Sequence, residues 1–301
     1  MDAKTLFLAT RPWSFTMTFS SVTVGTLLAF LLTRAFNPLL YLLAFAGMIA
    51  FHAATNLIND FYDVKHGVDR MGAPTTKYRP HPVAAGAESP GTIRLWAGAF
   101  YAFTLIAGVY LSLVISPWVL VLVCVGVAGS FLYTADPVVL KARGLGEVTA
   151  FLMWGPLIPL GAYLVQTGTL SALPVVLATP IGILVALVLL ANNIRDIDYD
   201  GSVGMKTVPV MIGKANGSAV YGGLLLITYA FVPVSIVAGL LPLWSLIVML
   251  TVPEAVGLSR MFTNEVPDNA DPRTAGLALK FSVLYMASLV LQIVLPLHFA
   301  L

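Results

Sequence analysis

Charged residues are scarce in this chain. Asp, Glu, Lys and Arg make up 10% of its 301 residues, and 58% of the residues are hydrophobic. A soluble domain carries about a quarter charged residues, so this composition excludes an ordinary water-soluble domain. Cysteine is nearly absent too, and the one cysteine, Cys124, cannot form an internal disulfide. The sequence predicts an integral membrane protein built as a single domain over residues 1–301, with membrane lipid around it and no nucleic-acid partner.

The chain also lacks the alternating polar and apolar pattern of β-strands. Its apolar runs are continuous and about 20 residues long, which is the length that crosses a bilayer as a helix. The runs are bounded by Pro, Gly, Asn or charged residues. We therefore expect an all-α polytopic membrane protein with nine transmembrane helices, placed at residues 13–33, 38–58, 95–114, 117–134, 147–166, 172–192, 217–239, 242–262 and 276–298.

The predicted helices place nearly all of the basic residues on one side of the membrane. Fifteen of the 16 Lys and Arg residues fall at the chain start or in alternate connections, and only Arg34 falls on the other side. Cytoplasmic loops carry the excess of Lys and Arg in membrane proteins. The pattern predicts a multi-pass protein of the cell membrane with a cytoplasmic N-terminus and an extracytoplasmic C-terminus.

Two acidic clusters stand out against the apolar background. The first is Asn59-Asp60-Phe61-Tyr62-Asp63, and the second lies within Asn192–Asp200 and contains Asp196 and Asp200. Each follows the second helix of a group of four, so we expect two pseudo-duplicated four-helix units plus one helix around a central cavity. Both clusters then lie at the cytoplasmic mouth. Carboxylates at a membrane boundary are costly, so this placement indicates a functional site.

The spacing within the clusters suits a metal–phosphate site. Asp60 and Asp63 are three residues apart, and Asp196 and Asp200 are four apart, so each pair shares one face if the helix continues. Carboxylate and amide oxygens suit Mg²⁺, which is held by one or two carboxylates plus substrate phosphates. Basic residues in the same connections can contact phosphate oxygens: they include Lys77, Arg79 and Lys206. Caps or solvated side chains explain one isolated cluster well, but less well two clusters at matched positions.

A secondary transporter is the alternative from another functional class. Duplicated bundles with membrane-level charges are common among transporters, which place their ionisable site near the bilayer midplane. Here the acidic residues gather at one face, and Glu254 is the main charged residue inside a predicted helix. Uptake into sealed vesicles without chemical transfer would favour the transporter.

At these residues the chain resembles the UbiA superfamily of intramembrane prenyltransferases, across nearly its whole length. The family's first motif, Asn-Asp-x-x-Asp-x-x-x-Asp, matches Asn59 to Asp63, and its second motif, Asp-x-x-x-Asp, matches Asp196 to Asp200. The third acid of the first motif would fall at Gly67, whereas the next acid here is Asp69.

Within that family, the chain is most similar to the 1,4-dihydroxy-2-naphthoate prenyltransferase branch of menaquinone synthesis. The similar segments are NNIRDIDYDGSVGMKTVPVMIG, YTADPVVLKARGLGE and RPWSFTMTFSSVTVGTLLA. The segment KYRPHPVAAG instead resembles hydroxybenzoate and archaeal lipid members. Alternative acceptors are therefore geranylgeranylglyceryl phosphate, a lipid alcohol, and hydroxybenzoate.

The resemblance implies an activity and a role for each matched residue. The donor would be an isoprenyl diphosphate whose tail leaves sideways into lipid, and the acceptor an aromatic compound. Asn59, Asp63, Asp196 and Asp200 would hold two Mg²⁺ ions, with Asp60 as a ligand or a neighbour of the ligands. Lys77, Arg79, Tyr133 and Lys141 would contact the diphosphate. Arg11 would hold an acidic acceptor, and the aromatic face of Tyr133 would also stabilise an allylic cation.

Overall fold

The protein is a bundle of helices in a computed structural model that describes residues 2–79 and 81–297. No β-strand is present among these residues, which confirms the all-α prediction. The helices and helical turns are, in chain order, α1 (Ala3–Ala9), η1 (Pro12–Ser14), α2 (Phe15–Thr33), α3 (Pro38–Lys65), α4 (Pro74–Tyr78), α5 (Pro90–Val114), α6 (Trp118–Thr134), η2 (Leu140–Ala142), α7 (Gly146–Leu152), η3 (Met153–Leu157), α8 (Ile158–Thr167), α9 (Ala172–Leu177), α10 (Thr179–Arg195), α11 (Ile197–Ser202), α12 (Val208–Ile212), α13 (Lys214–Val237), η4 (Leu243–Thr251), α14 (Val252–Asn264) and α15 (Ala270–Val294).

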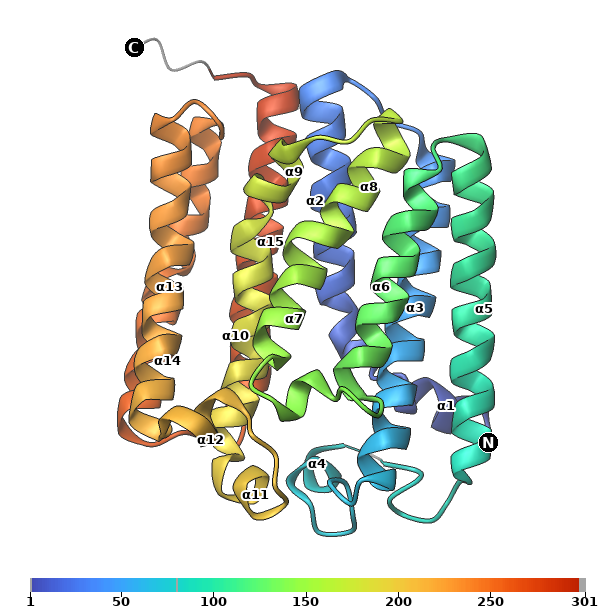
Figure 1. Cartoon of the computed structure of the whole chain (residues 1–301). Coiled ribbons are helices and arrows are strands. Elements are labelled where there is room, and N and C mark those ends of the chain that lie inside the picture. The colour runs from blue at the N-terminus through green and yellow to red at the C-terminus, as the bar shows by residue number, and fades with distance from the viewer. Residues whose placement is uncertain (1, 80, 298–301) are drawn as a thin grey trace.

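The long helices run alongside one another, and the short helices α1, α4, α11 and α12 gather at one end of the bundle (Figure 1). Within the described residues, seven helices are long and apolar enough to cross a membrane: Pro12–Thr33, Pro38–Lys65, Pro90–Val114, Gly146–Thr167, Lys214–Val237, Leu243–Thr263 and Ala270–Val294. Two further apolar helices are shorter, Trp118–Thr134 and Thr179–Arg195. A polytopic membrane protein is therefore confirmed, while nine spans and the duplication stay predictions.

Two predicted helix boundaries are wrong, and each difference has a physical reason. The second predicted helix ends at residue 58, but α3 continues to Lys65 and contains the whole first acidic motif. The carboxylates remain inside the helix because cationic side chains from other elements pair with them. The predicted helix 172–192 is divided into α9 and α10 at Ala178, two residues before Pro180. Proline has no N–H for the preceding turn, so it begins α10 rather than continuing α9.

Caps made by local side chains explain where several helices begin. Asn37 accepts hydrogen bonds from the backbone N–H groups of Leu39 and Leu40 at 3.0 and 3.2 Å, and Pro38 occupies the first helical position of α3. Ser89 caps α5 in the same way, again before a proline. A side-chain oxygen at this position satisfies N–H groups that have no partner inside the helix.

The buried core has a large part in the C-terminal half and a smaller part in the N-terminal half. The large cluster joins α10, α13, α14 and α15 with part of α2, and its biggest fully buried side chains include Tyr221, Phe281 and Tyr285. The second cluster joins α3 and α5 around Leu57 and Ile93. The polar cavity described below lies between these apolar packing regions.

Glu254, the acidic residue expected inside a helix, is paired. Both of its carboxylate oxygens accept hydrogen bonds from Nζ of Lys280, at 3.0 and 2.8 Å, across the α14–α15 contact. Neither residue belongs to the cavity lining formed by the described residues. The pair therefore indicates no transport path through the cavity.

Close packing between α2 and α8 predicts that Gly25 cannot carry a side chain. A Cβ atom there would lie 2.4 Å from the Pro159 carbonyl oxygen and 2.9 Å from Cβ of Ala162. We expect Gly25→Ala to lower the free energy of unfolding by about 1–3 kcal/mol, because a rigid backbone atom must move. Gly98→Ala in α5 is the matched control, since nothing lies within 4 Å of its Cβ position. Thermal unfolding in detergent measures both, and equal midpoints would contradict the prediction.

Candidate active site

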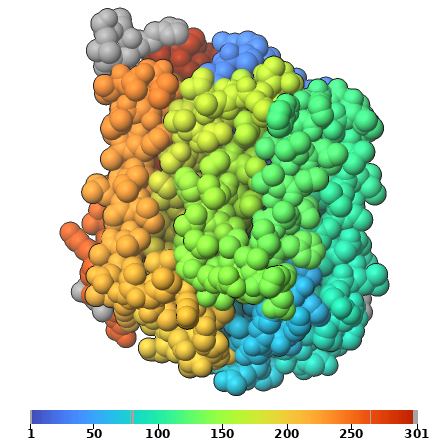
Figure 2. Space-filling model, viewed as in Figure 1, coloured from blue at the N-terminus to red at the C-terminus, as the bar shows by residue number. Residues whose placement is uncertain are grey.

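A cavity of about 770 Å³ opens at the end of the bundle where the acidic motifs lie. The motif-bearing loops meet there: the segment around α4 and the segment around α11 are neighbours on the surface in Figure 2, and the Tyr199 hydroxyl donates to the Val68 carbonyl at 2.6 Å. Most of the predicted site residues line this cavity: Arg11, Asn59, Asp63, Arg79, Tyr133, Lys141, Asp196 and Asp200. The tertiary structure thus brings together residues that are far apart in the chain.

The first motif presents its oxygens around the ammonium of Lys141. Nζ of Lys141 donates to Oδ1 of Asn59 at 2.6 Å and to Oδ1 of Asp63. Nδ2 of Asn59 donates to the other Asp63 oxygen at 2.9 Å, so the two side chains, one turn apart on α3, act as a unit. Lys141 comes from η2, after α6. Its ammonium shows that these oxygens form a site for a cation.

The second motif lies at the junction of α10 and α11. The guanidinium of Arg195 holds Asp196 with two hydrogen bonds of 2.8 and 2.7 Å and also pairs with Asp271 at the start of α15. Among the described residues, the side chain of Asp200 accepts only a long hydrogen bond, 3.5 Å, from the Thr207 hydroxyl. Burial, together with the nearby charge of Asp196, raises the pKa of Asp200 to about 7. A cation would relieve this repulsion, so the donor set suits Mg²⁺.

Asp60 faces away from the cavity and is the most buried carboxylate in the region, with 1% of its surface exposed. Arg79 donates to both of its oxygens, at 2.9 and 2.8 Å, and Arg11 donates to Oδ1 as well. Asp60 is not part of the lining that the described residues form. Two guanidinium groups thus occupy the positions that a metal ion would take at this carboxylate. The Asp60 carboxylate in turn orients these two cationic side chains toward the cavity.

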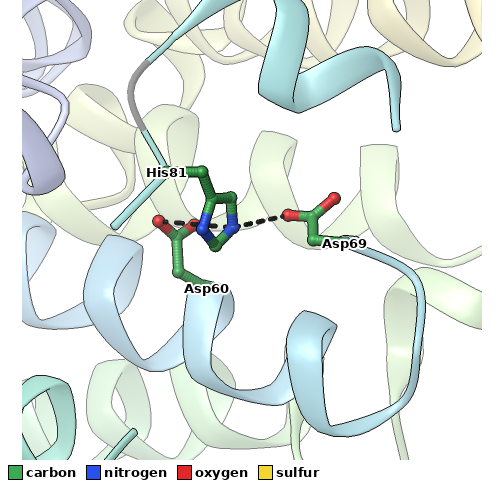
Figure 3. A group of neighbouring side chains, drawn as sticks. All are labelled: Asp60, Asp69 and His81. Carbon is green, nitrogen blue, oxygen red and sulfur yellow. Dashed lines mark hydrogen bonds and ion pairs between the residues drawn. The ribbon is translucent and has the colours of Figure 1, made fainter. Parts of the chain in front are cut away.

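His81 and Asp69 continue this buried network. Nε2 of His81 lies 3.0 Å from Asp69 and 3.8 Å from Asp60, with the imidazole between the two carboxylates (Figure 3). Thr75 also donates to Asp69, at 2.5 Å. Burial opposes ionisation of Asp69, but the His81 and Thr75 hydrogen bonds outweigh it and keep its pKa well below the usual range. These contacts hold Asp69, Thr75 and His81 close to α3. The ligand atoms of Asp60, Asp69 and His81 also lie within 4.8 Å of one another.

Two predicted basic residues lie apart from the cavity. The side chains of Lys77 and Lys206 are exposed, and neither belongs to the lining formed by the described residues. Lys206 instead uses its backbone N–H to donate to the Ala142 carbonyl at 3.2 Å, which joins the second loop to η2. Their proposed contact with diphosphate therefore requires movement of the loops.

Sequence reasoning missed a polar stripe deeper in the cavity. His52, Asn56, Asn59 and Asp63 follow one another on α3 at spacings of four, three and four residues, and all line the cavity. That spacing places them on one helix face, so it was a signal that could have extended the site. His52 lies about 16 Å from Asp63 along the helix axis, well away from the carboxylate end.

Glu147 is a second residue that sequence reasoning missed. It lies in the first turn of α7, is 9% exposed, and accepts a hydrogen bond from Nδ2 of Asn193 at 2.9 Å. Asn193 lines the cavity beside the second motif. Only the fold pairs these two residues, because 46 positions separate them in the chain.

Arg11 has an unusual backbone. Its φ and ψ of 56° and 59° lie in the left-handed region, which costs a non-glycine residue roughly 1–2 kcal/mol. Nε of Arg11 is buried, and no described residue accepts a hydrogen bond from it. A strained cationic residue with an unused donor at a cavity wall is a candidate for binding an anionic group.

Comparisons with known proteins agree with this architecture. A model of the UbiA prenyltransferase family matches residues 12–289. The 1,4-dihydroxy-2-naphthoate octaprenyltransferase of Bacillus subtilis (strain 168) is 31% identical over 265 residues, covering 88% of this chain and 84% of that protein. The apo structure of a UbiA homologue from Aeropyrum pernix K1 is similar with a TM-score of 0.72 and 18% identity, covering 93% and 98% of the two chains. The structure of a UbiA homologue from Archaeoglobus fulgidus bound to GPP and Mg²⁺ is similar with a TM-score of 0.64 and 16% identity. The match covers 95% of this chain and 99% of that chain.

The buried Asp60 cluster predicts a large loss of stability on neutralisation. Asp60→Asn should lower the free energy of unfolding by about 3–5 kcal/mol, because removing one partner leaves buried guanidinium groups without their counter-charge. Asp198→Asn is the control, since Asp198 is exposed in the neighbouring motif. Thermal or denaturant unfolding in detergent distinguishes them, and an Asp60→Asn protein as stable as the control would contradict the account.

Proposed function

The chain belongs to the UbiA prenyltransferase family, and from that membership and the cavity's geometry we propose that it transfers a prenyl group from an isoprenyl diphosphate to 1,4-dihydroxy-2-naphthoate, with Mg²⁺ as cofactor. The observation that carries the proposal is the pair of acidic motifs facing one cavity beside Lys141 and Arg79. The choice of acceptor is supported by the Bacillus subtilis relative, which is named for that reaction.

Mg²⁺ fits the residues present. Asn59 and Asp63 offer oxygens that already surround one cation, the Lys141 ammonium, and Asp196 and Asp200 offer a second set in which one carboxylate lacks a close partner. We propose one ion at each motif, two in all. When bound, Mg²⁺ supplies positive charge that stabilises a departing diphosphate. The Archaeoglobus fulgidus homologue of the same fold was solved with GPP and Mg²⁺.

The chain's own residues provide the rest of the mechanism. Lys141 and Arg79 donate hydrogen bonds to diphosphate oxygens as the C1–O bond of the donor breaks, which places positive charge where negative charge develops. The allylic cation that remains is stabilised by the aromatic face of Tyr133. Apolar side chains such as Met153 and Leu189 line the deeper cavity and keep water from the cation. The acceptor ring then attacks C1 and regains aromaticity by losing CO₂ or a proton.

The membrane orientation follows from the sorting of basic residues. Both acidic motifs lie at the bundle end that carries most of the Lys and Arg residues. We propose that this end faces the cytoplasm, that the chain crosses the membrane nine times with its C-terminus outside, and that the apolar tail of the donor extends from the cavity into lipid. A water-soluble diphosphate head and a membrane-soluble tail can then be bound together.

A product screen tests the function directly. Purified protein with Mg²⁺, prenyl diphosphates of several lengths and each candidate acceptor should yield a prenylated naphthoquinol precursor, detected by mass. Asp63→Ala and Asp196→Ala should each lower turnover by at least about 10²-fold, because charge that stabilises the departing diphosphate is lost. Each change also breaks a buried ion pair and should lower stability, so a retained cooperative unfolding transition separates the loss of turnover from loss of folding. Product formed only from geranylgeranylglyceryl phosphate or hydroxybenzoate would reject the proposed acceptor. Near-normal turnover of either variant at saturating Mg²⁺ would reject the metal site.

Mg²⁺ binding should depend on pH through Asp200. With its pKa raised to about 7, the carboxyl is protonated at lower pH and cannot bind a cation. We expect the apparent Mg²⁺ affinity to rise about tenfold per pH unit up to about 7 and then to level off, because binding displaces one proton. Titration calorimetry from pH 5.5 to 8.5 measures this. Asp200→Asn should bind more weakly with a flat profile, and a flat wild-type profile would disprove the role of Asp200.

A further inference from the structure

Hydrogen bonds through the buried Thr18 and His52 and the half-buried Trp154 and Ser14 connect the far wall of the cavity to the backbone of Arg11. Nε1 of Trp154 donates to Oγ1 of Thr18 at 3.4 Å, and that hydroxyl lies 2.8 Å from Nδ1 of His52. Nε2 of His52 lies 3.2 Å from Oγ of Ser14, whose hydroxyl donates to the Arg11 carbonyl at 2.7 Å. His52 is 5% exposed and stands at the centre of this chain.

For a neutral His52, donor counting gives the direction of every bond. Ser14 has one hydroxyl hydrogen and gives it to the Arg11 carbonyl, so its oxygen must accept from His52. His52 therefore carries its proton on Nε2, and its Nδ1 accepts from the Thr18 hydroxyl. The Thr18 oxygen in turn accepts from the Trp154 indole N–H. Each donor is used once, and the neutral histidine is held at both nitrogens.

A second arm holds the other side of Arg11. Nδ2 of Asn56 donates to the Thr10 carbonyl at 2.8 Å and lies 3.3 Å from the Ser14 hydroxyl oxygen. The Thr10 and Arg11 carbonyls belong to the peptide units before and after the Arg11 Cα atom. Anchoring both units fixes φ and ψ of Arg11. Those angles are left-handed, which L-residues avoid, and the following Pro12 adds a preference for extended backbone.

The conformation of Arg11 sets where its side chain points. The guanidinium reaches Asp60 on one side and lines the cavity on the other, and its buried Nε has no acceptor among the described residues. The aromatic side chains of Trp13, His52 and Trp154 line the same cavity. An unused charged donor beside aromatic walls suits a flat ring that bears a carboxylate.

We propose that His52 is a positioning residue: through Ser14 it holds Arg11 in the left-handed conformation in which the guanidinium binds the carboxylate of an aromatic acceptor. The inference rests on the proposed function, in which Arg11 holds an acidic acceptor. His52 does not touch the diphosphate end, about 16 Å away along α3. Its loss should therefore affect acceptor binding and leave donor binding alone.

Two inhibitors of equal shape test the charge specificity. We expect His52→Phe to raise the inhibition constant of 2-naphthoate at least tenfold, and that of 2-naphthamide less than twofold, because only the carboxylate needs Arg11. The KM of the diphosphate donor should change less than twofold. His52→Gln should recover part of the loss, since its amide N–H can donate to Ser14. Equal effects on both inhibitors, or no recovery in His52→Gln, would overturn the proposal.

A double-mutant cycle links His52 to Arg11. In the Arg11→Ala background, His52→Phe should have no further effect on 2-naphthoate inhibition, because there is no guanidinium to position. Full additivity would overturn the positioning role and leave the function proposed above intact. If Arg11→Ala alone does not weaken 2-naphthoate, both the positioning role and the proposed acceptor contact fail.

Loss of folding is controlled with one variant outside the cavity and with a second variant within the hydrogen-bond chain. Ser282→Ala removes a buried hydroxyl whose hydrogen bond stays inside α15, and it should leave both inhibition constants unchanged. If His52→Phe does not fold, Ser14→Ala breaks the same chain one bond nearer to Arg11. It should reproduce the selective loss of 2-naphthoate inhibition, and unchanged inhibition by both compounds would overturn the proposal.

Discussion

The carboxylate of Asp60 organises the polar end of this molecule. It is almost fully buried, and it can be ionised there only because Arg11 and Arg79 surround it. Breaking such a cluster leaves a buried charge without compensation. The Arg11 guanidinium comes from the segment before α2, and the Arg79 guanidinium comes from the segment after α4. The ion cluster therefore joins both of these segments to α3. The cavity mouth keeps its shape because those segments cannot separate from α3 without exposing unpaired charges.

The same constraint explains how a charged site exists inside an apolar bundle. Asp63 and Asp196, two buried carboxylates that face the cavity, each lie beside a cation: Lys141, from a distant part of the chain, contacts Asp63, and the adjacent Arg195 contacts Asp196 and also pairs with the distant Asp271. Asp200 is the exception: burial and the nearby charge of Asp196 raise its pKa. A site prepared in this way suits the proposed cations and phosphate oxygens, because both kinds of charge are held in a region of low dielectric. Apart from the polar stripe on α3, apolar and aromatic side chains such as Phe51, Met153 and Trp154 line much of the cavity, which fits the proposed prenyl chain and flat acceptor.

The polar stripe from His52 to Asp63 shows how one helix, α3, contributes side chains to both ends of the cavity. Its carboxylate end belongs to the proposed metal–diphosphate region, and its histidine end connects to Arg11 through Ser14. The proposed donor and acceptor regions thus lie along a stretch of about 16 Å of one rigid helix. Rigid placement matters for a reaction in which a short-lived cation must meet the acceptor ring before water does.

The sequence by itself determined the fold class, the membrane setting and the motif residues. Long uncharged runs can only be helices in lipid, because every backbone polar group must be satisfied within the segment, and the spacing of Asn59, Asp63, Asp196 and Asp200 pointed to cation binding. The helical spacing of His52 and Asn56 with the motif also carried a signal that could have extended the site. Only the tertiary structure decided that α3 continues through its motif, that Asp60 turns away from the cavity, and that Glu147 pairs with Asn193 beside the second motif. These outcomes depend on partners supplied by distant segments. The energy of a buried charge or hydrogen bond depends on the groups that contact it in the folded protein. A local sequence pattern does not specify those groups when they come from distant segments.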